Sequence, residues 1–352
     1  MGSKIIDNHV HIAGKGDVYS GDLYWSKKFT RGIGFKALII LKGWIFKKVG
    51  DKIMLGTLLK QVDRAKRIDH IVLLAFDNVY ASDGTYHGPR QPDQKEILST
   101  IYVSNEFVQK LSQANSKILA GISVHPFRND AVDELEKYKD TAALCKWMPS
   151  AQLIDFEDPS AQNKLDKFYA KLAEIRLPLL LHTGVETSIP SPCERYEKFN
   201  SPKYIERALN MGVPVILAHC GCSYFDAIQE DFVEDALRLF ERQKKECPEW
   251  KLYADVSALF SPFRARKILN RVFENVPPSK LIYGSDFPNP AKGRKEFILR
   301  PFFRFARRNL LDRSAKIAYK WLKYYYSETD AQSVMSGFHR LLIELDRSHI
   351  IK

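Results

Sequence analysis

The chain has 352 residues, of which 45% are hydrophobic and 27% charged, and its formal net charge is +12. This composition is typical of a soluble globular protein and excludes a disordered or fibrous one. The most apolar stretch, residues 37–46, contains Lys42 and falls well short of the roughly 20 residues that a transmembrane helix needs.

The cysteines give no sign of a disulfide framework. There are five of them, an odd number, and none forms a C-x-x-C pair. A reducing compartment is therefore expected. The N-terminal residues enter a strand pattern by Ile5, and no apolar segment of the signal-peptide type precedes it. We therefore expect a cytoplasmic protein.

Much of the positive charge lies between Lys292 and Lys323, where the run RPFFRFARR carries four arginines. Such a run can attract nucleic acid or an acidic surface, or steer an anionic small substrate. No nucleic-acid-binding motif accompanies it, so we interpret it as a solvated helix face. We expect the partner to be a small-molecule substrate, which can be anionic. We expect neither nucleic acid nor a membrane as a partner. The sequence does not indicate an oligomeric state.

Eight apolar runs typical of strands alternate with helical patterns along the chain. One helical pattern begins with Asp158 as N-cap and Pro159 at the first helical position. Alternation of this kind predicts an α/β fold, a parallel (β/α)8 TIM barrel. The strands are expected at residues 4–11, 70–76, 117–124, 142–147, 177–182, 213–219, 251–256 and 280–285.

Loop lengths agree with a barrel, because barrel enzymes keep their long loops after the strands. The long irregular segments 12–50, 77–96 and 183–200 all follow strand ends. Residues 13–50, rich in aromatic residues, are either a lid or pocket wall or a packed insertion without substrate contact. Residues 296–352 are expected to form extra C-terminal helices. We treat residues 1–352 as one domain.

Four of the apolar runs end in residues of the metal-binding kind: His9 with His11, His182, His219 and Asp286. Residues two apart on a strand share a face, so His9 and His11 can bind one ion together. A single histidine at a strand end is ordinarily a hydrogen-bonded core residue. Together, these imidazoles and the carboxylate are the ligand set of a zinc-type site that keeps one position open for water.

The strand ends carry five further motifs: DNHVH (7–11), CKWMP (145–149), LLLHTG (179–184), LAHCG (217–221) and YGSDFP (283–288). In this order along the chain they resemble the amidohydrolase superfamily, within it the amidohydrolase-2-like branch of metal-dependent TIM-barrel hydrolases and decarboxylases. The resemblance implies His9, His11 and His182 as metal ligands, with Asp286 from the eighth strand. In that family, the histidine at the position of His219 is either a ligand of a second metal or a catalytic acid/base beside a single metal.

Lys146 would decide between these two forms of the site. The resemblance implies that a lysine at the end of the fourth strand is carbamylated and bridges two ions in the binuclear members, whereas single-metal members typically lack it. A free ammonium next to a dication would be repelled. Three interpretations stay open: a carbamylated metal ligand, a salt bridge to a substrate anion, or an ion pair with a carboxylate such as Asp155 or Glu157.

The chemistry expected is metal-dependent hydrolysis of an amide, lactone or ester through a metal-activated water, with one or two divalent ions, zinc by default. Asp286 would take the proton of the attacking water, and His219 would stabilise the oxyanion directly or through a second ion. The alternative is a single-metal, non-oxidative decarboxylase of an aromatic or unsaturated carboxylic acid. A third hypothesis is a barrel that has lost catalysis and only binds a ligand or nucleic acid.

Weaker candidates also lie near strand ends. Asp255 would either orient a ligand histidine or form loop hydrogen bonds. Glu186 is expected in a surface loop, with a contact to metal water or substrate as the alternative, and His125 lines the pocket or is structural. His87 is an outside candidate for substrate contact, and the H-C-G-C run at residues 219–222 for a thiolate metal site.

Overall fold

The computed structural model describes residues 2–32, 35–36, 49–89, 97–186, 188–222, 232–260, 266–288 and 309–351. The arginine-rich run at residues 300–308 and most of the second half of the 13–50 insertion lie outside the described residues.

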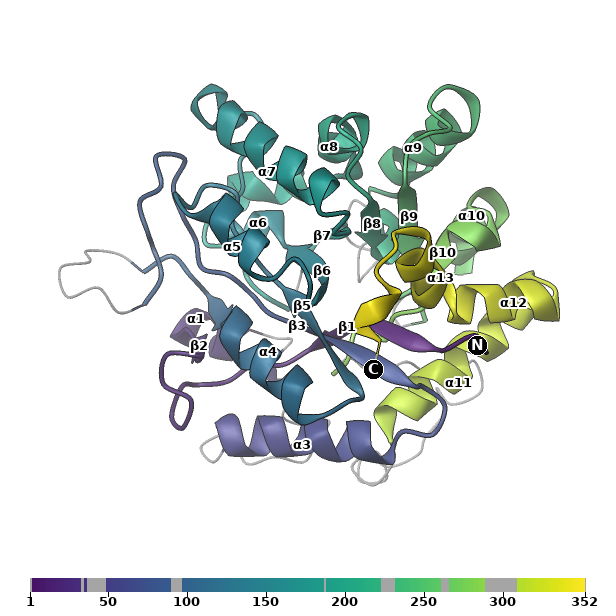
Figure 1. The fold of residues 1–352 in the computed structure, drawn as a ribbon, viewed down its shortest axis with the longest axis horizontal. Coiled ribbons are helices and arrows are strands. Elements are labelled where there is room, and N and C mark those ends of the chain that lie inside the picture. The colour runs from purple at the N-terminus through teal and green to yellow at the C-terminus, as the bar shows by residue number, and fades with distance from the viewer. Residues whose placement is uncertain are drawn as a thin grey trace.

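The core of the molecule is one sheet of eight strands whose paired neighbours all run parallel. A parallel bridge between Val10 and Phe287, with the His11 N–H donating to the Phe287 carbonyl at 2.8 Å, joins the first strand to the end of the last. The strands thus form a closed ring surrounded by helices (Figure 1), which confirms the predicted TIM barrel. They are β1 (Ile6–His11), β3 (His70–Leu74), β5 (Ile118–Ile122), β6 (Ala142–Trp147), β7 (Leu179–His182), β8 (Val215–Ala218), β9 (Leu252–Asp255) and β10 (Leu281–Ile282).

The helices bury one apolar face each against the outside of the strands. In the helix at Gln162–Glu174, for example, Leu165, Phe168 and Leu172 are buried at helical spacing. The Asp158 carboxylate accepts the Ser160 N–H at 2.8 Å, so Asp158 caps the short 3-10 helix that precedes this α-helix. Among the described residues, the helices before the C-terminal region are α1 (Lys27–Arg31), α3 (Asp51–Arg64), α4 (Asn105–Ala114), α5 (Ala131–Lys137), α6 (Pro149–Gln152), α7 (Gln162–Glu174), α8 (Glu206–Asn210), α9 (Val233–Lys245) and α10 (Arg266–Asn275). Short 3-10 helices lie at Pro159–Ala161, Glu194–Asn200, Pro202–Ile205, His219–Gly221, Pro278–Lys280 and Ser348–Ile350.

The C-terminal region forms α11 (Leu310–Tyr325), α12 (Glu328–Met335) and α13 (Gly337–Glu344). Phe338, Leu341 and Leu342 of α13 join the apolar side chains inside the barrel. The buried Arg347 then donates to the carbonyls of Lys139, Ile175 and Ala142, which lie at the start of β6 and just before β7. Because this region closes the end where the strands begin, the open end of the barrel is the one where the strands finish.

Two features shape the loops at that open end. A ribbon of β2 (Leu23–Trp25) and β4 (Ile101–Val103) pairs antiparallel, and Val103 also bridges to Phe76 after β3. The buried carboxylate of Asp51 accepts four backbone N–H groups from residues 15–19, at 2.6–3.0 Å. The beginning of the insertion after β1 is therefore anchored to α3, and its role as a lid stays a prediction. Among the described residues, none of the helices combines the length and apolar character needed to cross a membrane.

Candidate metal centre

Three candidate ligands converge where β1 and β10 end. The Nε2 atoms of His9 and His11 lie 3.0 Å apart, and Asp286 Oδ1 lies 3.7 Å and 3.3 Å from them, respectively. One ligand atom from each residue lies within 4.8 Å of the other two. His9 and Asp286 are buried, whereas His11 is partly exposed. The three side chains can therefore hold one ion that is accessible from the His11 side.

His9 is held in the form that binds a metal. Its Nδ1 lies 2.7 Å from Asp255 Oδ2, so Nδ1–H donates to the carboxylate and Nε2 keeps its lone pair. Burial, reinforced by the nearby Lys146 charge, lowers the pKa of His9 to about 3. Burial would raise the pKa of Asp255, but its interactions with His9 outweigh this and hold it below its ordinary value. A neutral imidazole beside an ionised carboxylate is thus the stable pair.

Asp255 also positions His219. Its Oδ1 accepts the His219 backbone N–H at 3.0 Å, and the His219 ring stacks against that of His9 with 5.1 Å between centroids. The Nδ1 of His219 lies 2.9 Å from the Ser257 carbonyl, which can only accept, so Nδ1 carries a hydrogen. With its hydrogen on Nδ1, a neutral His219 ring offers its lone pair at Nε2, as His9 does.

His182 and Lys146 lie on the other side of the site. His182 contacts His219 edge to face, with 5.2 Å between ring centroids, and its Nε2 is 3.3 Å from Glu186 Oε2. Within the described part of the chain, His182 belongs to neither of the two groups of converging ligand atoms, which are His9–His11–Asp286 and His9–His219–Asp255. Glu186 points inward with a side chain only 9% exposed, so the expectation of a surface loop position is wrong.

Lys146 is 1% exposed, and its Nζ has no hydrogen-bond partner among the described residues. The expected alternative of an ion pair with Asp155 or Glu157 is not found: Glu157 pairs with Lys198, and Asp155 accepts backbone N–H groups. Burial lowers the pKa of Lys146 to about 8, against the opposing effect of Asp255, Asp286 and Glu186. The Lys146 amine therefore loses its proton at a pH only slightly above neutral.

The backbone is strained at two of the candidate residues. His219 has φ +61° and Asp286 φ +56°, in the left-handed region that costs non-glycine residues of order 1–3 kcal/mol. Close to these two residues, the buried carboxylate of Asp7 links β1 to the segment after β10. It accepts the N–H groups of His9 at 3.2 Å and Ser285 at 2.8 Å. Surrounding hydrogen bonds therefore help to hold the ligands in place.

Of the remaining candidates, His125 and the two cysteines take structural positions, whereas a substrate contact of the His87 side chain stays a prediction. The Nε2 of His125 hydrogen-bonds the Gln152 carbonyl at 2.9 Å and its Nδ1 accepts the Phe127 N–H at 3.1 Å, so both ring nitrogens are in use. Cys220 and Cys222 are part of the apolar layer outside the strands, which does not support a thiolate site. His87 takes part in backbone hydrogen bonds with Val79, Leu98 and Ser99 in the loop after β3.

Two residues of the site, Asp7 and Ser257, were not anticipated. Each lies two positions from a candidate on the same segment, Asp7 before His9 and Ser257 after Asp255. Their spacing of two positions from a recognised candidate was the feature of the sequence that could have identified them.

A comparison with known protein families shows which family this chain belongs to. The amidohydrolase family model matches residues 99–321, which is more than half of the chain. The chain belongs to the amidohydrolase family. This is a superfamily of enzymes that includes hydrolases and decarboxylases, and divalent metals are typical of it. No curated protein sequence matches the chain.

Solved structures similar to this amidohydrolase-family chain share its fold at low identity. An uncharacterised TIM-barrel protein from Bordetella bronchiseptica is 14% identical, with TM-score 0.58 over 97% of this chain and 99% of that one. A putative 2-pyrone-4,6-dicarboxylic acid hydrolase from Pseudomonas putida is also 14% identical, with TM-score 0.55 over 98% and 99%. A 2,6-dihydroxybenzoate decarboxylase has TM-score 0.51 at 14% identity, over 98% and 100%.

Proposed function

We propose that this protein is a metal-dependent hydrolase that acts on the carbonyl group of a small molecule, namely an amide, a lactone or an ester. The observation that carries the proposal is the convergence of His9 Nε2, His11 Nε2 and Asp286 Oδ1 at the open end of the barrel. Imidazole nitrogens with a carboxylate oxygen fit a divalent transition metal, and we propose zinc. The neutral state of His9 supports this fit, because only a neutral imidazole binds a metal.

His9, His11 and Asp286 would hold one ion, and His182, His219 and Lys146 are the further candidates. When bound, such an ion lowers the pKa of water and polarises the carbonyl under attack. Lys146 Nζ, together with His182 Nδ1, has no hydrogen-bond partner within the described residues, which fits side chains that bind a group other than the protein itself.

Asp286 would act as the proton acceptor for the attacking water and pass the proton to the leaving group. Burial opposes ionisation of its carboxyl, but the hydrogen bond with His11 and the interactions with the other nearby histidines outweigh burial and keep its pKa below the ordinary value. Asp286 is therefore ionised at neutral pH, as a base must be.

The geometry around His219 favours the role of a ligand over that of an oxyanion donor. Since Nδ1–H is used by the Ser257 carbonyl, the neutral ring has no second N–H to donate. His219 can donate from Nε2 only when it is protonated. We therefore propose that it contributes its Nε2 lone pair to the site, in the two-metal form.

Carbamylation of Lys146 would complete the two-metal form of the site. A neutral amine attacks carbon dioxide, the new N–C bond forms, and one proton is released, which leaves a carboxylate-like ligand. The lowered pKa of Lys146, about 8, supplies the neutral amine that this step needs.

The experiment is metal analysis of the full-length protein purified without added metal, together with intact mass of the native protein. We expect two metals per chain, a mass increase matching one carbamate, and hydrolysis of at least one member of an ester, lactone and amide panel. Lys146→Arg, which keeps the charge but cannot form the same carbamate, is the matched variant and should lose the added mass. Metal-free protein that retains full hydrolytic activity would contradict the proposal.

The second candidate is a single-metal decarboxylase of an aromatic or unsaturated carboxylic acid. It is favoured by the charges around Lys146, because Asp255, Asp286 and Glu186 all stabilise its ammonium form, which would not be a metal ligand. One metal per chain, an unmodified lysine, and release of carbon dioxide from a hydroxybenzoate would favour this function over hydrolysis.

We further propose that the substrate is a small molecule, which can be anionic, and that neither nucleic acid nor a membrane is a partner. We also propose that the protein works in the cytoplasm. No disulfide joins its five cysteines, all of which lie within the described residues, and this supports a reducing compartment.

A further inference from the structure

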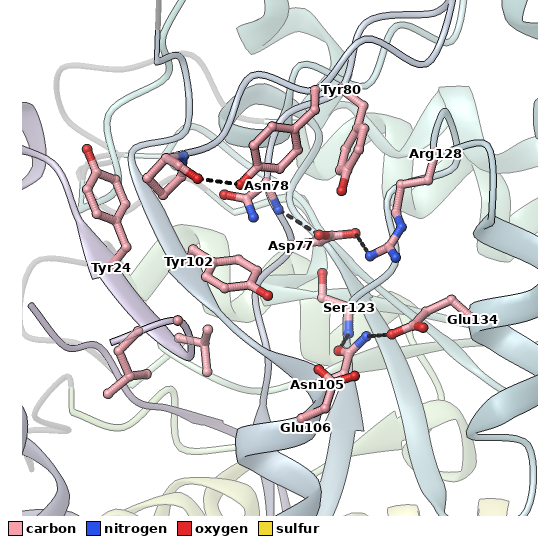
Figure 2. Close-up of a pocket in the computed structure, with 15 residues that line it drawn as sticks. Tyr24, Asp77, Asn78, Tyr80, Tyr102, Asn105, Glu106, Ser123, Arg128 and Glu134 are labelled. Carbon is pink, nitrogen blue, oxygen red and sulfur yellow. Dashed lines mark hydrogen bonds and ion pairs between the residues drawn. The ribbon is translucent and has the colours of Figure 1, made fainter. Parts of the chain in front are cut away.

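A cavity of about 450 Å³ lies beside the ends of β3 and β5. Its walls come from the β2–β4 ribbon, from the segment after β3, and from the first turns of α4 and α5 (Figure 2). None of the described residues that line it is a candidate metal ligand. A cavity of this size is in the range that holds small-molecule ligands.

The charges on the cavity walls are mostly negative. Asp77, Glu106 and Glu134 are lining residues, and the lining cation is Arg128. Arg128 is already engaged: its Nη1 lies 3.2 Å from Asp77 Oδ2, and its Nε and Nη2 donate to the two oxygens of Asp130 at 2.8 Å and 2.7 Å. Glu106 and Glu134 share one cation, Lys137, whose Nζ lies 2.5 Å and 3.7 Å from their carboxylate oxygens. Four carboxylates on and behind this wall thus share two cations. An anionic ligand would therefore be repelled, whereas a cation would be attracted.

Aromatic rings form much of the remaining wall. Tyr24, Tyr80, Tyr86 and Tyr102 line the cavity. Figure 2 shows the rings of Tyr24, Tyr80 and Tyr102 around it. Burial raises the pKa of Tyr80 and Tyr102, so both stay neutral and keep their π-faces and hydroxyl groups. The Arg128 guanidinium lies 5.7 Å from the centre of the Tyr80 ring, so this wall already accommodates one cation.

Asn78 supplies an unused acceptor. It is 4% exposed and lines the cavity, and its Oδ1 has no hydrogen-bond partner among the described residues. Figure 2 shows its amide between the tyrosine rings and Asp77. A buried acceptor without a partner costs free energy, which a ligand with an N–H donor would offset.

We propose that this cavity is a binding site for a small organic cation that carries an ammonium group, separate from the metal centre. The ammonium would lie among the lining carboxylates and donate to Asn78 Oδ1, and the apolar part of the ligand would pack on the tyrosine rings. This proposal does not depend on the reaction at the metal centre.

The test is calorimetric titration of the full-length protein with three probes of matched shape and different charge: tyramine, 4-ethylphenol and 3-(4-hydroxyphenyl)propanoate. We expect tyramine to bind at least tenfold more tightly than 4-ethylphenol, and the propanoate to bind most weakly. Since an amine can also coordinate a metal, the titration is repeated after treatment with a chelator, and tyramine affinity should not change.

Two glutamates provide a matched pair of variants. Glu106 lines the cavity and Glu136 does not; each is about half exposed and pairs with a lysine on the surface, Lys137 and Lys139 respectively. Glu106→Gln should weaken tyramine binding three- to tenfold, and Glu136→Gln should leave it unchanged. Absence of tyramine binding, equal affinity for the three probes, loss of binding with the metal, or equal effects of the two variants would each overturn the proposal.

Discussion

The two sides of the candidate metal centre are built differently. On the side of β1, β9 and β10, the protein itself orients the functional groups. Asp255 binds His9 Nδ1 at 2.7 Å and the His219 N–H at 3.0 Å, and His11 contacts Asp286 at 3.3 Å. On the side of β6 and β7, Lys146 Nζ and His182 Nδ1 have no hydrogen-bond partner in the described part of the chain.

This difference indicates which part of the site is ready before any cofactor binds. Hydrogen-bonded histidines keep their orientation and tautomer without a metal. A buried amine without a partner, by contrast, carries a desolvation cost that only an added group can offset. We infer that the β1–β9–β10 side is preorganised by the fold and that the β6–β7 side is completed by what binds there.

The largest effect should follow from Asp286→Asn on the preorganised side. Asparagine keeps the shape of the side chain and tolerates the left-handed backbone at φ +56°, so folding should be preserved. The charge that we propose to hold the metal and accept the proton is lost, and kcat/KM on any ester, lactone or amide that the wild type hydrolyses should fall by about 10²–10⁴-fold. Steady-state kinetics and metal analysis measure both.

Glu157→Gln, which removes an exposed carboxylate that pairs with Lys198, is the control and should keep full activity. Activity of Asp286→Asn within a few fold of the wild type would show that this carboxylate is not the base.

The next largest effect should come from Asp7→Asn, which should change how the free energy of unfolding depends on pH. Burial raises its pKa from 3.8 to about 7, although hydrogen bonds from Ser285 lower it in part. Between these two values the folded state binds the extra proton, so this group lowers the stability as pH rises from 3.8 to 7. Asp7→Asn removes that pH dependence, and relative to wild type its free energy of unfolding should rise by about 2–4 kcal/mol between pH 4 and pH 8.

Urea unfolding of the metal-free proteins at both pH values measures the difference. A difference between variant and wild type that does not change with pH would mean that Asp7 is ionised throughout.

Asp255→Asn should have a smaller effect, because it disturbs the orientation of His9 and His219 without removing a ligand. Loss of such a supporting carboxylate typically costs about 10–100-fold in metal affinity or activity. Competition with a chromogenic chelator measures the affinity. An equally large loss in Glu186→Gln, on the other side of the site, would contradict the proposed difference between the two sides.

The sequence was sufficient to predict the barrel and the strand ends that carry His9, His11, His182, His219 and Asp286. Each strand is a continuous apolar run, and ligands at the ends of parallel strands reach the same end of the barrel by symmetry of the fold. The distances between them were not predictable. Whether the site binds a metal through these residues stays a prediction.

The supporting contacts lay outside what the sequence could give. Asp255 meets His9 across 246 positions of the chain, and no local pattern specifies such a pair. Glu186 reads as a loop residue, yet its Oε1 accepts the N–H groups of Ser188 and Ile189 in a tight turn that directs it inward. The ribbon strands β2 and β4 have three residues each, too few for a period, so the tyrosine-lined cavity beside them was also missed.

Lys146→Met should have the smallest effect and tests the incomplete side of the site. Methionine has nearly the same length and shape but needs no hydrogen bonds, so the free energy of unfolding of the metal-free protein should rise by about 1–2 kcal/mol at pH 7. The pKa of Lys146 falls from 10.5 to about 8 on folding, so the unfolded chain binds the extra proton between these values. Wild-type stability should therefore recover as pH rises from 8 to 10.5, and the advantage of the variant should shrink.

The exposed Lys139, which pairs with Glu136 on α5, provides the control, and Lys139→Met should show no such gain at pH 7. A destabilised Lys146→Met in the metal-free state would mean that the wild-type ammonium is already satisfied there by its carboxylate neighbours. The contrast between the two sides would then fail, because the β6–β7 side would be as complete without a cofactor as the side that holds His9 and Asp286.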